Sequence, residues 1–75
     1  MRNSLYSARY KRFLARLRGA RKAAGLSQAQ AARRLRRPQS FLSKVESGER
    51  RVDIVELEEL ARVYRVDPAD FLERS

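Results

Sequence analysis

The apolar residues of the chain recur at helical spacing, and no segment alternates apolar and polar residues as a half-buried strand would. Near the N-terminus, Tyr10, Leu14 and Leu17 follow one another at intervals of four and three residues, so they share one helix face. This pattern predicts a first helix over about residues 8–24, and Gly25 suits the left-handed conformation that ends many helices.

Capping signals divide the next part of the chain into two short helices. Ser27, with Gln30 three residues later, has the spacing of a capping box and predicts the start of a second helix. Pro38 suits the first turn of a third helix, because the missing N–H of proline costs nothing there. Gly48, directly after Ser47, predicts the end of that helix. The two helices are therefore expected to be joined by a turn of three to four residues.

The C-terminal part carries two further helix starts. Asp53 and Glu56 form a second capping box, and Asp67 before a proline predicts a short fifth helix with Phe71 and Leu72 facing inward. The expected buried stripe of the fourth helix consists of Ile54, Leu57, Leu60, Ala61 and Tyr64. We therefore expect one all-α domain of five short helices that spans the whole chain.

The N-terminal aromatic residues are interpreted mainly as core. Tyr10 and Phe13 lie at helical spacing, and aromatics in such a pattern belong to the core more often than to a stacking surface. The position of Tyr6 stays open. Residues 1–7 are expected to form a flexible N-terminal arm.

Charge is distributed very unevenly along the chain. The net charge is +9, and residues 1–45 contain thirteen Lys or Arg and no acidic residue, whereas residues 46–75 contain five basic and nine acidic residues. Arginines can simply keep exposed helices soluble, but thirteen uncompensated positive charges would repel one another. The pattern instead favours one strongly positive face and a nucleic acid as the partner.

Several classes of protein are disfavoured by what the chain lacks. It has no cysteine and no histidine, which removes the usual nucleophile, general base and metal ligands, and its three glycines are too far apart for a phosphate-binding loop. We therefore expect no enzyme activity, no metal and no cofactor. The N-terminus has no apolar run of a signal peptide and no segment could span a bilayer, so we expect a cytoplasmic protein without a membrane partner.

The expected third helix has two different faces. On a wheel of about 100° per residue, Phe41, Leu42, Val45 and Glu46 fall on one half. The other half holds no acid and consists of Gln39, Ser40, Ser43, Lys44 and Ser47. Short hydroxyl, amide and lysine side chains can approach base-pair edges, although an ordinary solvated surface would look the same. The short capped helix and turn before it favour a helix-turn-helix unit.

A family resemblance rests on positions in and around these two helices. Gly25-Leu26-Ser27-Gln28, Ala32, Leu35, Leu42-Ser43, Glu46 and Gly48 resemble the signature of Xre-type, lambda-repressor-like helix-turn-helix regulators. The resemblance covers roughly residues 13–72. It implies a five-helix lambda-repressor-like DNA-binding domain in which the second and third helices form the helix-turn-helix and the third enters the major groove.

The resemblance also implies roles for individual residues. Gln39 and Lys44 are the strongest candidates for base reading, since glutamine pairs with adenine and lysine with guanine, and Ser40 and Ser43 complete the base-contacting set. Gln28 would bind a phosphate through its side chain or backbone N–H. The full expected set of backbone contacts is Ser27, Gln28, Arg36, Arg37, Arg50 and Arg51.

Arg36 stands where the family usually has glycine, and a non-glycine residue in a left-handed turn costs on the order of 1 kcal/mol. Either the turn has shifted, or the strain is accepted because Arg36 reaches a phosphate. Arg21 and Glu46 match a pair of residues that the family joins in a partly buried ion pair, with a solvated Arg21 as the alternative.

The sequence therefore predicts a sequence-specific, double-stranded DNA-binding transcriptional regulator, and specifically a repressor that acts as a homodimer on a palindrome. Phe71, Leu72 and the end of the fourth helix are candidates for the dimer surface, unless Phe71 belongs to the core. The main alternative is an antitoxin or restriction-modification controller that binds a partner protein and its own promoter. Binding to RNA or an anionic membrane is disfavoured, because the basic residues are not confined to one amphipathic helix.

Overall fold

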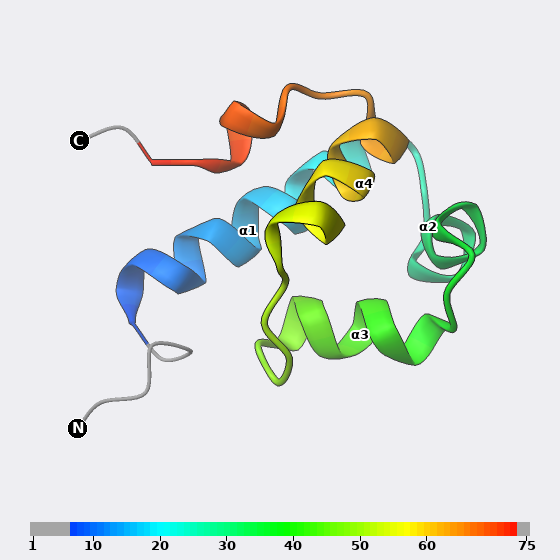
Figure 1. Ribbon diagram of the computed structural model, residues 1–75, viewed down its shortest axis with the longest axis horizontal. Helices are drawn as coiled ribbons and strands as arrows, with labels where there is room; N and C mark the ends of the chain where they lie inside the picture. Colours follow the sequence, from blue (N-terminus) through cyan, green and yellow to red (C-terminus); the bar gives the residue numbers. More distant parts are fainter. Residues whose placement is uncertain (1–6, 74–75) are drawn as a thin grey trace.

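The computed structural model describes residues 7–73, in which all regular structure is helical (Figure 1). The elements are α1 (Ala8–Ala23), α2 (Gln28–Leu35), α3 (Gln39–Ser47), α4 (Ile54–Tyr64) and the 3-10 helix η2 (Pro68–Phe71). The all-α class is as expected. None of the described helices is long and apolar enough to cross a membrane.

The expected fifth helix differs from the prediction in kind. It is a single 3-10 turn, in which Asp70 N–H donates to the carbonyl of Asp67 and Leu72 N–H to that of Ala69. The backbone is already extended at Leu72, with φ −96° and ψ 144°, so no α-helical turn is completed. The described residues thus contain four α-helices and one 3-10 helix, not five α-helices.

α1 begins at Ala8, close to the predicted start, and Ser7, the last residue of the expected arm, belongs to its cap. The hydroxyl of Ser7 accepts a hydrogen bond from the Tyr10 N–H at 3.0 Å, so Ser7 caps α1. Residues 1–6, including Tyr6, lie outside the described residues. At the other end, Gly25 has φ +76° and closes the helix as predicted.

Both predicted capping boxes are present. Ser27 Oγ accepts from the Gln30 N–H at 3.1 Å, and Gln30 Oε1 accepts from the Ser27 N–H at 2.9 Å. Asp53 and Glu56 exchange the equivalent pair of hydrogen bonds at 2.8 and 3.0 Å. Each box satisfies two N–H groups that a helix start leaves without an internal acceptor, which fixes where α2 and α4 begin.

The core is built from one face of each helix. Its largest fully buried side chains are Leu17, Leu42, Val45, Leu60 and Phe71. Each contributes about 1.5–3 kcal/mol by leaving water. Tyr10 and Phe13 are half-buried and pack against this cluster, with their ring centroids 5.3 Å apart. Phe71 therefore belongs to the core and is not part of a free dimer surface.

Two residues that were expected to face inward do not. Ile54 is 70% exposed, because it is the first residue of α4 and lies beyond the end of the core. Leu72 is 59% exposed, because the chain turns extended directly after η2. Both contribute apolar surface at the solvent boundary instead of core volume.

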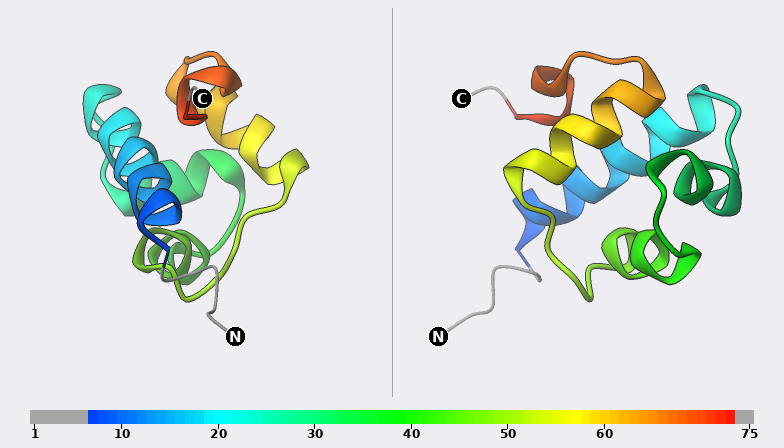
Figure 2. Two further views of the ribbon diagram at one scale, coloured as in Figure 1. Left: turned by 90° about the vertical axis from the view of Figure 1, so that its left-hand side faces the viewer. Right: turned by 45° about the vertical axis from the view of Figure 1, so that its right-hand side comes forward.

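The packing leaves α3 at one edge of the molecule. It contacts α2 and α1, whereas η2 packs against α1 and α4 on the opposite side (Figure 1). Figure 2 shows α3 at the lower edge from two further directions. One side of α3 therefore holds the fold together while the other is open to a partner.

Candidate nucleic-acid interface

The open side of α3 is the polar face that the sequence predicts. Leu42, Val45 and Glu46 are buried. All of the polar positions opposite them are exposed, namely Gln39, Ser40, Ser43, Lys44 and Ser47. The face presents amide, hydroxyl and ammonium groups and no carboxylate, which is the chemistry that reads base edges in a major groove.

The turn that places α3 after α2 is short and strained. It spans residues 36–38, and Arg36 is left-handed with φ +60° and ψ 43°. The turn has therefore not shifted to avoid the usual glycine position. Arg36 N–H and Arg37 N–H close α2 by donating to the carbonyls of Arg33 and Ala32 at 3.1 and 3.0 Å. The side chain of Arg36 is exposed and lies three residues before the first residue of α3.

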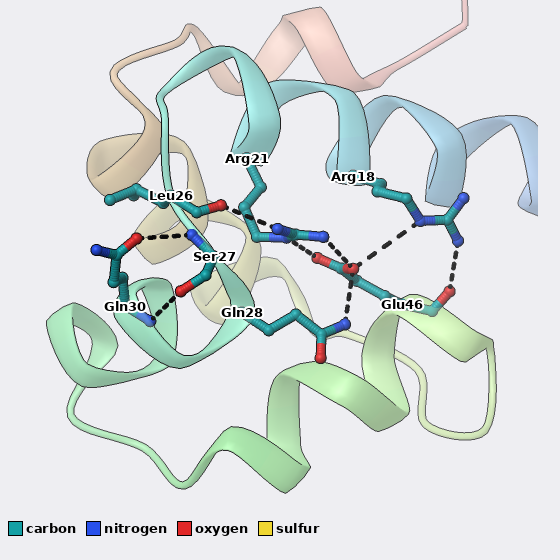
Figure 3. Close-up of polar contacts among 7 residues, drawn as sticks. All are labelled: Arg18, Arg21, Leu26, Ser27, Gln28, Gln30 and Glu46. Carbon is teal, nitrogen blue, oxygen red and sulfur yellow. Dashed lines mark hydrogen bonds and ion pairs between the residues drawn. The ribbon is translucent and has the colours of Figure 1, made fainter.

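A buried ion pair fixes α3 against α1 (Figure 3). Arg21 Nε donates to Glu46 Oε2 at 2.7 Å and Arg21 Nη2 to Glu46 Oε1 at 3.0 Å. A third donor of Arg21 reaches the Leu26 carbonyl at 2.9 Å. Arg21 is only 8% exposed and Glu46 4%, so a solvated Arg21 does not describe this molecule. The pair is bidentate, which fixes both the distance and the orientation of the two helices.

Glu46 also binds two further side chains. Gln28 Nε2 donates to Glu46 Oε1 at 3.0 Å, and Arg18 Nε lies 3.9 Å from the same oxygen while its Nη2 donates to the Glu46 carbonyl (Figure 3). Gln28 Nε2 thus gives one of its two hydrogens to Glu46, and a phosphate contact through its other hydrogen or through the backbone N–H stays a prediction. The capping box occupies the N–H of Gln30, whereas the N–H groups of Gln28 and Ala29 in the same first turn have no acceptor within the helix.

The environment of Glu46 keeps its carboxylate charged. Burial by itself would raise the pKa of Glu46. Hydrogen bonds from Arg21 and Gln28, together with the charges of Arg21 and Arg18, outweigh burial and hold the pKa below its ordinary value. Burial also raises the pKa of Tyr64 to about 12, with a smaller contribution from the nearby Glu46 carboxylate.

A second carboxylate holds two of the expected phosphate-binding arginines. Arg50 forms two hydrogen bonds of 2.9 Å with Glu56, and Arg37 Nη1 lies 3.3 Å from Glu56 Oε2. Arg37 also lies 3.8 Å from a carboxylate oxygen of Glu59. Sequence reasoning assigned Glu56 only to the cap of α4, because no spacing rule links it to arginines before and after another helix.

The remaining expected contacts flank α3 or begin α2. Ser27 serves as the cap of α2, with its hydroxyl engaged by Gln30. The Arg51 guanidinium lies 4.7 Å from the centroid of the Tyr10 ring, an arrangement of the cation–π type. The exposed face of α3 is therefore flanked by Arg36 and Arg37 on its N-terminal side and by Arg50 and Arg51 on its C-terminal side.

A separate groove lies between α1, the start of α4 and η2. Its volume is about 530 Å³. Its apolar lining includes Tyr10, Phe13, Leu57, Phe71, Ile54 and Leu72. Arg12 holds Glu73 at its edge through hydrogen bonds of 2.6 and 3.0 Å. The groove brings together Ile54 and Leu72, two of the three large apolar residues that are exposed among the described residues.

Comparison with known proteins places these features in a family. A helix-turn-helix domain family matches residues 12–73. The chain is also similar to a solved structure described as an XRE-family like protein from Pseudomonas syringae pv. tomato str. DC3000. That similarity has 47% sequence identity and a TM-score of 0.80, over 85% of this chain and 78% of the other. Comparison with curated proteins gave no match.

Proposed function

The chain belongs to the Xre-type family of helix-turn-helix, DNA-binding regulators, and from this premise we propose that it is a sequence-specific repressor that binds a palindromic operator as a homodimer in the cytoplasm. The observation that carries the proposal is the exposed, acid-free face of α3, held outward by the buried pair of Arg21 and Glu46. Such a face is suited to a major groove, because its donors and acceptors are short and held on a fixed helix.

Base reading is assigned to four side chains on this face. Gln39 is the first residue of α3, and its amide can form two hydrogen bonds with adenine. Lys44 can donate to guanine from the following turns, while Ser40 and Ser43 lie between them and accept or donate at close range. Each well-formed pair of hydrogen bonds is worth about 1–3 kcal/mol of discrimination between bases.

Positioning on the phosphates is assigned to the ends of the two helices. Ser27 and the backbone N–H of Gln28 lie at the start of α2, where the helix dipole favours an anion. Arg36, Arg37, Arg50 and Arg51 flank α3, and these contacts carry no sequence information. Their number sets the salt dependence of binding, with a slope of about 0.9 for each neutralised phosphate.

Dimerisation is assigned to the exposed apolar surface near the groove. A single helix-turn-helix contacts about four to six base pairs, so useful specificity requires two half-sites about 34 Å apart. Ile54, Val55 and Leu72 are the large apolar side chains that are most exposed among the described residues. A second copy would cover them, whereas Phe71 already serves the core of each protomer.

The antitoxin or controller alternative shares the same DNA-binding face and adds a partner protein. A neighbouring toxin or restriction-modification gene would favour it over a self-contained repressor. In that case the partner, instead of a second copy of the chain, would cover the exposed apolar residues.

Selection of bound duplexes from a randomised DNA pool tests the proposal, with the wild type beside Gln39→Ala. We expect a palindromic motif for the wild type and loss of preference at one symmetric pair of positions in Gln39→Ala. Arg51→Ala serves as the contrast, because loss of a phosphate contact should weaken binding to all sequences and preserve the motif. If the wild type yields no motif and its affinity only follows salt, base reading by α3 is wrong.

A further inference from the structure

Glu56 stands at the centre of a cluster that the DNA-binding scheme does not explain. The residue is 5% exposed and lies in the first turn of α4. Its Oε1 accepts from Arg50 Nη1 at 2.9 Å and from the Asp53 N–H at 3.0 Å. Its Oε2 accepts from Arg50 Nη2 at 2.9 Å and lies 3.3 Å from Arg37 Nη1.

The two arginines in this cluster come from opposite ends of the recognition helix. Arg37 directly precedes Pro38, the cap of α3, and Arg50 follows Gly48, which ends it. Both guanidinium groups lie over the ring of Phe41 in α3, at 4.5 and 4.8 Å from its centroid. The carboxylate of Glu56 on α4 therefore holds one arginine from each end of α3, namely Arg37 and Arg50.

The charges in the cluster favour retention of the arginines by the protein. Hydrogen bonding from Arg50, followed by the capping bond and the charges of Arg50 and Arg37, holds the pKa of Glu56 below its ordinary value against the opposing effect of burial. The carboxylate is thus ionised at neutral pH. A phosphate that approaches Arg50 or Arg37 must compete with a fixed negative charge that already has bidentate geometry.

This competition affects DNA binding through the phosphates alone. Affinity for any duplex depends on how many phosphates are neutralised, so arginines held by Glu56 reduce it directly. The contacts of Glu56 are with Arg50, Arg37 and the Asp53 N–H, and not with the polar side chains on the face of α3. Withholding two cations from phosphate therefore lowers the affinity for operator and random duplex alike and leaves base preference unchanged.

We propose that Glu56 competes with DNA phosphates for Arg37 and Arg50, so that these two arginines contribute less to phosphate binding than fully available arginines would, and the affinity for any duplex is kept low. This inference rests on the proposed function as a sequence-specific DNA-binding protein. Glu56 acts through the two arginines and does not itself touch DNA.

The test compares Glu56→Gln with a matched control. Glutamine retains an oxygen that can accept from the Asp53 N–H, so the cap of α4 is kept while the charge is lost. Glu58→Gln makes the same change of charge on the same helix, at an exposed residue that forms no ion pair with the described residues 7–73. Affinity for the selected operator and for a random duplex is measured for each variant over a series of salt concentrations.

We expect Glu56→Gln to bind the random duplex more tightly than Glu58→Gln does. Its log–log salt slope should be steeper by up to about 1.8 per protomer, since each released arginine adds about 0.9. The ratio of operator affinity to random-duplex affinity should stay unchanged, because phosphate contacts carry no sequence information. Equal slopes and equal random-duplex affinities in the two variants would overturn the inference.

Arg37→Gln and Arg50→Gln in the wild-type background test the same idea without any change at Glu56. If Glu56 withholds the arginines, each substitution should change the random-duplex slope by well under 0.9. A full loss of about 0.9 in each would mean that both arginines already bind phosphates, which also contradicts the inference. Thermal melting of each variant identifies any that is unfolded, and the arginine variants decide the matter if Glu56→Gln is among them.

The outcomes separate this inference from the function on which it rests. A wild-type protein with no preference for any duplex would contradict the proposed function. A selective wild type, together with equal DNA affinities and salt slopes of Glu56→Gln and Glu58→Gln, would contradict only the role of Glu56.

Discussion

Arg36 and Arg65 close α2 and α4 with the same left-handed backbone, each at φ +60°. A side chain in this region strains the backbone by on the order of 1 kcal/mol relative to glycine. At Arg36 the strained residue stands in the turn of the helix-turn-helix, and its side chain is exposed and is proposed to contact a DNA phosphate. At Arg65 the same strain lies outside the DNA-binding unit, and nothing in the described structure gives its side chain a role there.

These two positions allow strain and charge to be separated. Arg36→Gly is expected to raise the free energy of unfolding by up to about 1 kcal/mol and to weaken binding to random DNA. Arg65→Gly should give a similar gain in stability without an effect on DNA. Chemical denaturation and salt-dependent binding measure both quantities. If Arg36→Gly raises stability and DNA affinity together, Arg36 does not bind phosphate.

At the scale of elements, three helices meet at one carboxylate. Glu46 on α3 receives two hydrogen bonds from Arg21 on α1 and one from Gln28 on α2. These bonds lie on the buried side of α3, opposite to its exposed polar face. The same side chain therefore holds the helix-turn-helix together and sets the direction in which α3 faces solvent.

Removal of this carboxylate should be costly. Glu46→Ala leaves Arg21 buried without its partner, and breaking a buried pair from one side costs about 3–5 kcal/mol. We expect a sharp fall in the melting temperature, measured by circular dichroism. Glu49→Ala, an exposed glutamate just after the end of α3, is the control and should change little. A melting temperature for Glu46→Ala within error of the wild type would mean that the pair of Arg21 and Glu46 does not stabilise the fold.

At the scale of the whole molecule, the arginine-rich N-terminal part is tied to the acidic C-terminal part by a few carboxylates. Glu46 pairs with Arg21, Glu56 with Arg37, and Glu73 with Arg12. Hydrogen bonding from Arg12 is the main reason why the pKa of Glu73 also lies below its ordinary value. Some of the N-terminal arginines therefore form ion pairs that connect the two parts of the chain.

The stability of the fold should therefore decline in acid. Each of Glu46, Glu56 and Glu73 has a lower pKa in the folded state than the ordinary value of 4.5, so the unfolded chain binds protons first. Their contribution is complete above that value and is lost as the pH falls through the lower folded values. Denaturation curves from pH 7 to pH 2 should show this decline. High salt should weaken the exposed Glu73 pair more than the buried Glu46 pair. A free energy of unfolding that is constant below pH 4.5 would contradict this explanation.

Local sequence patterns were sufficient to predict the four α-helices and the exposed polar face of α3. Capping boxes and helical periodicity depend on residues three or four positions apart, so Ser27 with Gln30 and Asp53 with Glu56 could be identified without knowledge of the fold. The pairing of Arg21 with Glu46 came from the family resemblance, since no local rule joins those positions.

Local patterns did not predict which polar side chains have partners within the protein, or which apolar side chains stay exposed. Gln28 binds Glu46, Arg37 and Arg50 bind Glu56, and Ile54 and Leu72 lie at the surface. These contacts join residues that are distant in the sequence, or depend on where a helix ends relative to the core. Their partners are set by how helices pack, and side-chain periodicity along one helix carries no information about that packing.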